Sequence, residues 1–170
     1  MPPLIKNSSY FDHILLRNSS RHIENILLKT QTITGHMKEK IPDVIKQFFE
    51  TISIMAFSTA DKNGTPNVVP IASKKIVNDD TILVIDTFFK KTKENILQNK
   101  NVSIAMWKGS KGYQIKGLST YHSKGKTFDE AKEWILKLKP NKIIKGVVEI
   151  KITDIYSITP TREEAGMRII

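Results

Sequence analysis

Two lysines and a threonine stand where the sequence predicts that an extended strand gives way to a helix. They are Lys90, Lys91 and Thr92, in the stretch DTFFKKTKENILQN. The first turn of a helix exposes unpaired backbone N–H groups and the positive end of the helix dipole, which together attract anions. Cations in that turn are unfavourable unless an anion lies between them, and a threonine hydroxyl can donate to a phosphate oxygen. The stretch therefore indicates a phosphate site, although lysine-rich helix starts also occur without a ligand.

An orderly series of helices and strands surrounds this junction. Apolar residues at helical spacing predict helices within IPDVIKQFFETI, KKTKENILQN and TFDEAKEWILKLK, and Thr127 with Glu130 has the spacing of a capping box in the last. The apolar stretches that predict strands are SIMAFSTA, NVVPIASKKIV, TILVIDT, VSIAMWK, YQIKGLSTYH and KIIKGVVEIKITDIYSITP. Six strands joined by hairpins, with helices inserted twice, predict a mainly β fold with short helices and a six-stranded antiparallel barrel.

The chain divides by composition into an extension, a regular body and a tail. Residues 1–36 are rich in Ser, Asn and His and show little periodicity, so we treat them as an N-terminal extension. Met37 fits either an internal start or, with Gly35 and His36, a cloning junction. The predicted domain spans residues 37–160, and residues 161–170 form a C-terminal tail.

Composition narrows the class of protein. A chain of 170 residues has room for one domain with a sizeable core, and the absence of cysteine excludes disulfides and thiolate metal sites. No apolar run approaches the roughly 18–20 residues of a spanning helix, and the N-terminus lacks a secretory pattern. We therefore expect a soluble, cytoplasmic protein. The formal net charge of +10 implies anionic partners.

Protein-based catalytic motifs are absent from the sequence. It contains no nucleophile elbow, no Walker A loop, no glycine-rich dinucleotide motif and no zinc pattern. His122 is the one histidine of the body and reads as a surface residue, and Asp79-Asp80 reads as a turn. We therefore predict no catalytic side chain and no metal site, so that a cofactor would carry any chemistry.

Three stretches resemble the pyridoxamine 5′-phosphate oxidase-like FMN-binding split barrels. They are FSTADKNGTPNVVPI, ILVIDTFFKKTKENILQNKNVSIAMW and GYQIKGLSTY. The likeness is greater to the small FMN-binding proteins of that family than to the oxidase itself. It implies a six-stranded split β-barrel that forms a homodimer, with one FMN in each of two clefts at the interface.

The resemblance also implies which positions bind FMN. These positions are Asn67, Val68, Val69, Pro70, Asp86, Thr87, Lys90, Lys91, Thr92, Asn95, Trp107 and Gln114. Residues 67–70 would line the flavin ring and ribityl chain, and residues 86–87 would meet the pyrimidine or ribityl side. Lys90, Lys91, Thr92 and Asn95 would hold the phosphate. Trp107 and Gln114 would reach a flavin from the partner subunit.

Departures from the oxidase pattern bear on the substrate. Asn67 stands where the oxidase has an arginine, and Ala72 stands where it has a lysine. The arginine-rich C-terminal segment that binds pyridoxal phosphate in the oxidase has no counterpart here. Oxidation of pyridoxamine phosphate is therefore not expected, and the phosphate contacts fall to Lys91, Thr92 and Lys90.

These features favour an FMN-dependent oxidoreductase or a small electron carrier, whose substrate and electron donor the sequence does not identify. A deazaflavin-dependent reductase on the same fold is one alternative, because an acidic coenzyme tail would suit the six lysines between Lys100 and Lys126. A basic nucleic-acid-binding barrel is another, with Trp107, Tyr113 and Tyr121 as a stacking platform. Lysine rather than arginine dominates that stretch, which makes a nucleic-acid partner the weaker reading.

Overall fold

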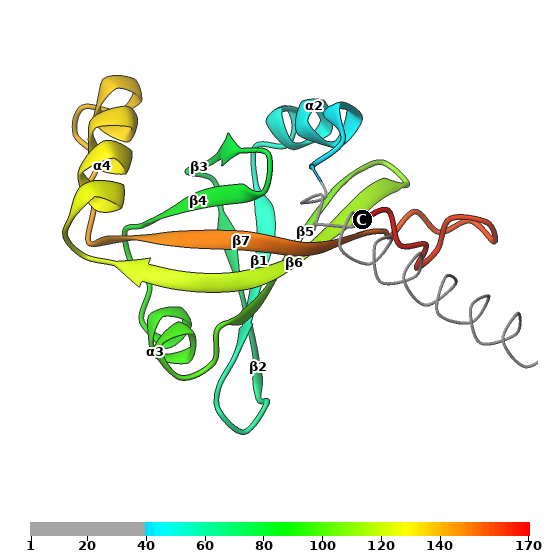
Figure 1. Ribbon diagram of the computed structural model, residues 1–170, viewed down its shortest axis with the longest axis horizontal. Coiled ribbons are helices and arrows are strands. Elements are labelled where there is room, and N and C mark those ends of the chain that lie inside the picture. The colour runs from blue at the N-terminus through cyan, green and yellow to red at the C-terminus, as the bar shows by residue number, and fades with distance from the viewer. Residues whose placement is uncertain (1–39) are drawn as a thin grey trace, which may run out of the picture. The chain divides into compact units, whose positions relative to one another are not determined.

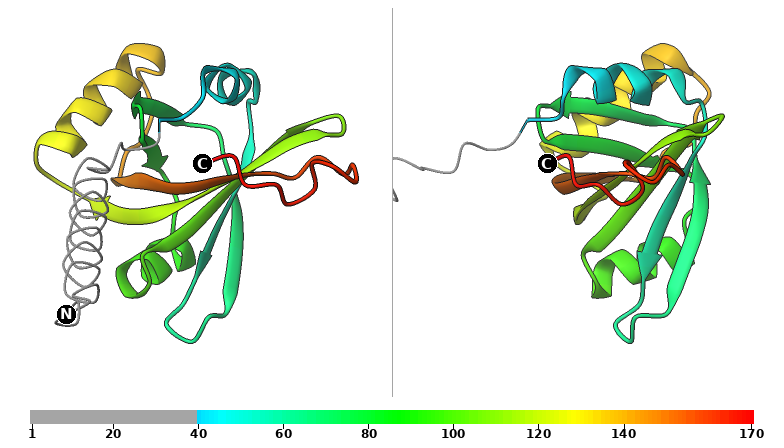
Figure 2. Two further views of the ribbon diagram at one scale, coloured as in Figure 1. Left: turned by 45° about the vertical axis from the view of Figure 1, so that its right-hand side comes forward. Right: turned by 90° about the vertical axis from the view of Figure 1, so that its right-hand side faces the viewer.

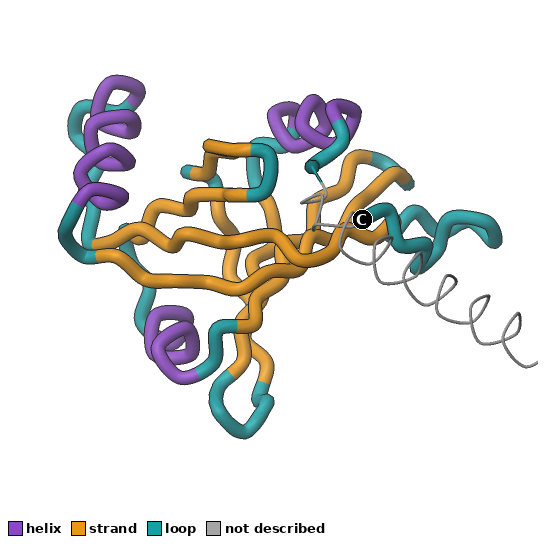
Figure 3. The backbone as a smooth tube through the Cα atoms, in the orientation of Figure 1, coloured by secondary structure: helices purple, strands orange, loops and turns teal. Residues whose placement is uncertain are grey.

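The computed structural model describes residues 40–170, so the predicted extension 1–36 lies outside the described residues. Three helices and seven strands follow one another along this part of the chain (Figure 1; Figure 3). In chain order they are α2 (Asp43–Thr51), β1 (Met55–Ala60), β2 (Pro66–Ile71), β3 (Lys74–Asn78), β4 (Thr81–Asp86), α3 (Lys91–Gln98), β5 (Asn101–Lys108), β6 (Lys111–His122), α4 (Lys126–Leu138) and β7 (Gly146–Ser157). Within residues 40–170, no helix combines the length and the apolar character that crossing a membrane requires.

The strands form one antiparallel sheet in the order β2-β1-β5-β6-β7-β4-β3. This arrangement corrects two predictions: the sheet has seven strands rather than six, and it is open rather than a closed barrel. The extra strand arises because NVVPIASKKIV divides into β2 and β3. These two strands lie at opposite edges of the sheet and do not pair with each other.

The division occurs at Ala72 and Ser73, where the chain changes its pairing partner. β2 is paired with β1 up to Ile71, and the next backbone contact is made by the Ser73 carbonyl, which accepts the N–H of Ile85 at 2.9 Å. From Ile71, the last residue of β2, to Lys74, the first of β3, an extended chain spans only about 10 Å. The two edges of the sheet must therefore curl toward each other at this point. Figure 2 shows this strong twist and curl.

Strand β4 is buried along its whole length, because both of its faces are covered. Ile82 and Val84 belong to the main core, which α2 also enters. Leu83 and Ile85 alternate with them and pack under α4 in a second cluster. Successive side chains of a strand point to opposite faces, so a strand covered on both sides has a continuous apolar sequence. This explains why TILVI shows no polar alternation.

Helix α4 begins earlier than the capping box predicts. Its N-cap is Gly125, with φ of 88°, and it carries no side-chain cap. Thr127 is therefore already inside the helix and does not cap it, which makes the capping-box prediction wrong. A positive φ is the conformation that glycine adopts at little cost, so Gly125 sets the boundary through its backbone freedom.

The predicted C-terminal tail folds back onto β7. The N–H of Ile169 donates to the carbonyl of Ile155 at 2.7 Å, and the N–H of Ile155 donates to the carbonyl of Ile170 at 3.1 Å. Both terminal isoleucines also pack, partly buried, against the main core. The tail is therefore part of the folded structure.

Ion pairs tie α2 and the residue Lys40 before it to the turn between β3 and β4. Asp79 in this turn lies 2.9 Å from Lys40 and 2.9 Å from Lys46. Hydrogen bonds from Lys40 and Lys46, and then the charges of both lysines, lower the pKa of Asp79 to about 2. A carboxyl whose pKa is lowered by folding stabilises the fold above its unfolded pKa, and this contribution is lost as the pH falls.

Replacing Asp79 should reduce the acid sensitivity of the fold. We expect the urea midpoint of Asp79→Asn to fall less than that of the wild type between about pH 4 and pH 2, because only the wild type must protonate this paired carboxylate on unfolding. Urea titrations of both proteins across this range measure the difference. Lys46→Met should also reduce the fall of the urea midpoint over this pH range, because it removes one of the two lysines paired with Asp79. Parallel pH profiles for all three proteins would contradict the assignment.

Candidate functional site

A buried carboxylate fixes the corner between β4 and α3. Asp86 is almost fully buried; one of its carboxylate oxygens accepts the N–H of Phe89 at 2.7 Å and the other accepts the hydroxyl of Tyr121 at 2.7 Å. Burial, together with the hydrogen bond to Asp86, raises the pKa of Tyr121, so the phenol stays a donor. Both oxygens of Asp86 thus have protein partners. The Asp86 side chain therefore holds the corner in place.

Helix α3 starts at this corner, as the sequence predicts, with Lys90 as its N-cap and Lys91 as its first residue. No side chain caps its first turn, and both lysines are exposed. Glu94 lies 4.0 Å from the Lys91 ammonium, at the outer limit of an ion pair. The helix start therefore keeps free N–H donors beside two exposed cations, an arrangement that suits an anion.

A hydrogen-bond network joins α3 to β2. The side-chain amide of Asn67 on β2 donates to the Thr92 hydroxyl at 3.1 Å and to the Thr59 hydroxyl at 3.2 Å. Asn95 donates to the same Thr59 hydroxyl at 3.2 Å. Its buried Oδ1 has no hydrogen-bond partner among residues 40–170. The two predicted cofactor segments, residues 67–70 and 90–95, are thus in contact, and the buried Thr92 is a structural partner of Asn67.

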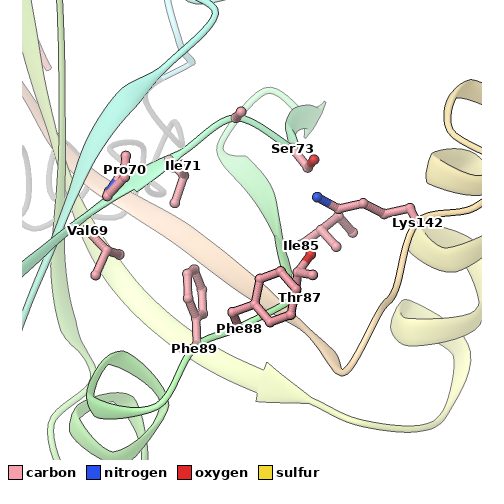
Figure 4. Close-up of a pocket in the computed structure, with 10 residues that line it drawn as sticks. Val69, Pro70, Ile71, Ser73, Ile85, Thr87, Phe88, Phe89 and Lys142 are labelled. Carbon is pink, nitrogen blue, oxygen red and sulfur yellow. The ribbon is translucent and has the colours of Figure 1, made fainter.

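A cavity of about 310 Å³ opens between β2 and the β4–α3 corner (Figure 4). Its volume lies at the lower end of the range for small-molecule sites. The lining residues are Val69, Pro70, Ile71, Ala72, Ser73, Ile85, Thr87, Phe88, Phe89 and Lys142. Three of the predicted positions, Val69, Pro70 and Thr87, are therefore brought together in one cavity.

The cavity has an apolar side and a polar side. Val69, Ile71 and Phe89 supply the apolar side, and the hydroxyls of Ser73 and Thr87 gather with the Lys142 ammonium on the other (Figure 4). The lining residues that the sequence did not predict are Ile71, Ala72, Ser73, Ile85, Phe88, Phe89 and Lys142. The apolar ones read as ordinary strand or corner residues. Lys142 follows Pro140 in a loop, where no periodicity marks a site residue.

A second hollow, of about 460 Å³, lies beside the first. Val69 and Pro70 line both hollows, so β2 forms part of the wall between them. Three large apolar side chains at the second hollow are more than half exposed: Ile54, Val68 and Trp107. Gln114 is half-buried on β6 opposite Ala105 and lines neither hollow. Within one chain, Trp107 and Gln114 are therefore not part of the first cavity.

Other titratable groups in the described part of the chain form no metal site. No cluster of three or more His, Asp or Glu residues with metal-binding geometry occurs within residues 40–170. His122 is half-buried, and its Nε2 lies 2.9 Å from a Glu149 oxygen on the neighbouring strand. This pair joins β6 to β7 and is absent from the lining of the cavity.

Comparison with known proteins places the chain in a family. A sequence model of the pyridoxamine 5′-phosphate oxidase family matches residues 41–159. An uncharacterised protein of Methanocaldococcus jannaschii is 36% identical over 108 residues, which cover 62% of this chain and 72% of that protein. The family match over residues 41–159 contains every residue of both hollows.

Solved structures share the fold. HupZ of Group A Streptococcus has a TM-score of 0.66 at 22% identity, covering 75% of this chain and 98% of that one. An FMN-binding protein of Syntrophomonas wolfei has a TM-score of 0.60 at 18% identity, covering 83% and 99%. HutZ, the haem storage protein of Vibrio cholerae, has a TM-score of 0.55 at 13% identity, covering 69% and 94%. At these sequence identities, the three structures show that the fold is shared and show nothing about function.

Removing the phenol that binds Asp86 should loosen the corner. We expect Tyr121→Phe to lower the free energy of unfolding by about 1.5–3 kcal/mol, because a buried carboxylate loses one of its two protein donors. Urea denaturation measures this change. Tyr156→Phe is the matched control, since its hydroxyl lies 3.5 Å from Asp154 at the limit of a hydrogen bond. Equal losses in the two variants would show that the Tyr121–Asp86 bond has no special role.

Proposed function

The chain belongs to the pyridoxamine 5′-phosphate oxidase family, and we propose that it is an FMN-binding flavoprotein. The observation that carries the proposal is the cavity between β2 and the β4–α3 corner. Its walls come from the two segments expected to contact the flavin, and the shared fold of the FMN-binding protein of Syntrophomonas wolfei supports the same cofactor. The cofactor would be bound non-covalently.

The start of α3 is the end of the site that suits the cofactor phosphate. Its backbone N–H groups have no side-chain cap, and Lys90 and Lys91 are exposed beside them. Thr92 and Asn95 are buried in the network with Thr59, so their role is to fix the helix start against β2. Lys91 is therefore the side chain on which phosphate binding would depend most.

FMN would supply hydride or electron transfer, which needs no carboxylate or histidine from the protein. The lining holds no carboxylate and no histidine. Val69, Ile71 and Phe89 offer apolar contact to a flat ring system and exclude water from one side of it. The Thr87 hydroxyl, buried without a partner among the described residues, could hydrogen-bond to a polar ring edge. These features are compatible with an oxidoreductase and equally with an electron carrier.

The visible absorption spectrum of the purified protein tests the proposal. FMN added to the protein and separated from free ligand should remain bound and give a flavin spectrum. Retention of a deazaflavin coenzyme instead would favour the reductase alternative. A haem Soret band without flavin uptake would favour haem storage, the role of HutZ. Salt-sensitive binding of single-stranded nucleic acid, with no flavin retained, would favour the basic-barrel alternative.

The second hollow suits a homodimer interface. Ile54, Val68 and Trp107 expose 61%, 60% and 54% of their surface there. Neighbouring exposed apolar side chains of this size are typical of interaction surfaces, with tryptophan among the residues that contribute most to binding. Because β2 separates this hollow from the cavity, a second copy bound here would lie close to the cofactor. Trp107 and Gln114 of that copy are the residues the resemblance places against the flavin.

Replacing the first lysine of α3 should weaken binding of the cofactor phosphate. We expect Lys91→Ala to raise the Kd for FMN roughly tenfold or more and to leave the Kd for riboflavin nearly unchanged, because riboflavin lacks the phosphate. Isothermal titration of both ligands measures the two constants. Lys100→Ala, an exposed lysine just beyond the other end of α3, is the control and should change neither. An equal loss for FMN and riboflavin in Lys91→Ala would refute the phosphate role.

A charge placed in the second hollow should break the dimer. We expect the wild type to sediment as a dimer and Trp107→Asp as a monomer, because a buried unpaired carboxylate is costly at an interface. Leu138→Asp on α4 is the matched control, since Leu138 is also mostly exposed. Sedimentation equilibrium measures the masses. A wild-type monomer, or a Trp107→Asp dimer, would contradict this surface as the interface.

A further inference from the structure

One end of the sheet is surrounded by lysines. β4 and β6 end here, and β7 begins between them (Figure 1). The segments that adjoin these strand ends are residues 87–93, 123–126 and 139–145. They contain three, two and three lysines respectively, and none contains an aspartate or a glutamate. This end of the molecule therefore attracts anionic partners.

Most of this positive charge has no partner within residues 40–170. Lys91 lies 4.0 Å from Glu94, and Lys126 lies 3.8 Å from Glu130. The other lysines of the three segments form no ion pair with a described residue. The Lys93 ammonium instead lies 4.7 Å from the centre of the Tyr121 ring. The surface thus stays strongly positive.

Two exposed apolar side chains lie among these lysines. Phe88 exposes 73% of its surface and Ile143 exposes 57%. Lys145 joins their two segments, because its N–H donates to the carbonyl of the last β4 residue at 2.9 Å and its ammonium lies 5.4 Å from the centre of the Phe88 ring. Neighbouring exposed side chains of this size are typical of interaction surfaces. The corner patch consists of Phe88, Lys93, Lys124, Ile143 and Lys145.

The corner patch borders the cavity proposed for FMN. Phe88 lines the cavity with one edge while most of its surface faces solvent, and Lys142, the neighbour of Ile143, also lines it. Figure 4 shows both side chains reaching the cavity from these two segments. A molecule bound to the patch would therefore lie beside the cofactor. The patch shares no residue with the second hollow, so the proposed dimer leaves it free.

The composition of the patch favours a protein partner. Few apolar side chains surrounded by charges are typical of the small interfaces of short-lived redox complexes, in which charge steers the encounter. Every cation of the three segments is a lysine, whereas arginine is preferred for recognition of nucleic acids. A membrane surface would require a continuous apolar face, and here the apolar side chains lie on a corner and a loop.

We propose that the corner patch binds an acidic electron-donor protein, which reduces FMN in the adjacent cavity. The basic surface stands on the structure alone, and the assignment of its partner as an electron donor rests on the proposed function. Two electrons pass from the donor to FMN and two protons come from solvent, so the donor is oxidised and the flavin is reduced. Electrons pass through the contact, and the donor therefore does not need to enter the cavity.

Calorimetric titration with acidic and basic redox proteins tests the patch. The probes are a plant-type ferredoxin, which is an acidic iron–sulfur protein, and the basic cytochrome c, each added to the FMN-loaded and the flavin-free protein at low ionic strength. We expect ferredoxin to bind both forms with a Kd on the order of micromolar and cytochrome c to bind neither. Lys145→Glu should raise the Kd for ferredoxin about tenfold or more, and Lys124→Glu should raise it too. The Kd for FMN should stay within about twofold in both variants, because neither lysine lines the cavity.

Arg162→Glu is the matched control for these charge reversals. Arg162 is exposed and follows the opposite end of β7 from Lys145. The eleven residue steps along β7, from Gly146 to Ser157, span about 36 Å of extended strand. Arg162→Glu changes the net charge as much as Lys145→Glu does, and it should leave the Kd for ferredoxin nearly unchanged.

Stopped-flow mixing tests the electron-donor role. Reduced ferredoxin is mixed with the FMN-loaded protein, and the loss of flavin absorbance is followed. We expect Lys145→Glu to lower the second-order rate constant about tenfold or more at low salt. The rate constants of the wild type and this variant should converge near 1 M salt, where the Debye length is about 3 Å. Ile143→Ser should lower the rate constant at every salt concentration, because it removes an apolar contact.

The outcomes separate this proposal from the FMN proposal. No binding of ferredoxin to either form, or an equal loss in Arg162→Glu, overturns the docking surface. Tighter binding of phosphatidylserine vesicles or single-stranded DNA through Lys145 assigns the patch to that partner and overturns it as well, as does a monomeric Lys145→Glu variant in sedimentation. Binding of ferredoxin without reduction of the flavin overturns the donor role. If no flavin is retained but ferredoxin binds in a Lys145-dependent way, the FMN proposal fails and the acidic-protein surface stands.

Discussion

A two-residue link between the opposite edges of the sheet is the constraint on which the rest of the structure depends. β2 and β3 end the strand order on either side, and only Ala72 and Ser73 separate them in sequence. In a flat sheet of this size the edges would lie roughly 29 Å apart, since neighbouring strands are about 4.8 Å apart. The link spans about a third of that distance. The sheet must therefore curl, and the curl brings β2 opposite the β4–α3 corner, where the cavity lies.

The far wall of the cavity depends on a second constraint, the burial of Asp86. A buried carboxylate is tolerated only when its oxygens are hydrogen-bonded, so the Phe89 N–H and the Tyr121 hydroxyl must both stay in place. Phe89 is also a lining residue, and Thr87 lies between it and Asp86 in the chain. The position of these lining residues is thus set by Asp86 and Tyr121, which do not line the cavity. A ligand would meet a preformed wall, which reduces the ordering cost of binding.

Local sequence signals predicted the elements well where local chemistry decides them. The helix at residues 91–98 was found because a polar, uncapped start follows an apolar strand, and the contact between residues 67–70 and that helix was implied by the resemblance. The break at Ala72–Ser73 was missed because neither residue is a breaker; pairing with β1 and then β4 creates it. Lys142 was missed for a similar reason, since only the folded loop brings it to a strand end far away in sequence.

The lysines near the two ends of β2, Lys91 and Lys142, lie on other elements than the cations of the oxidase pattern. Asn67 and Ala72 are neutral where that pattern has an arginine and a lysine. At the first end of β2, Asn67 contacts Thr92, the neighbour of Lys91; at the other, Ala72 lines the cavity together with Lys142. Positive charge is thus retained at both ends of β2 but is carried by a helix start and a loop.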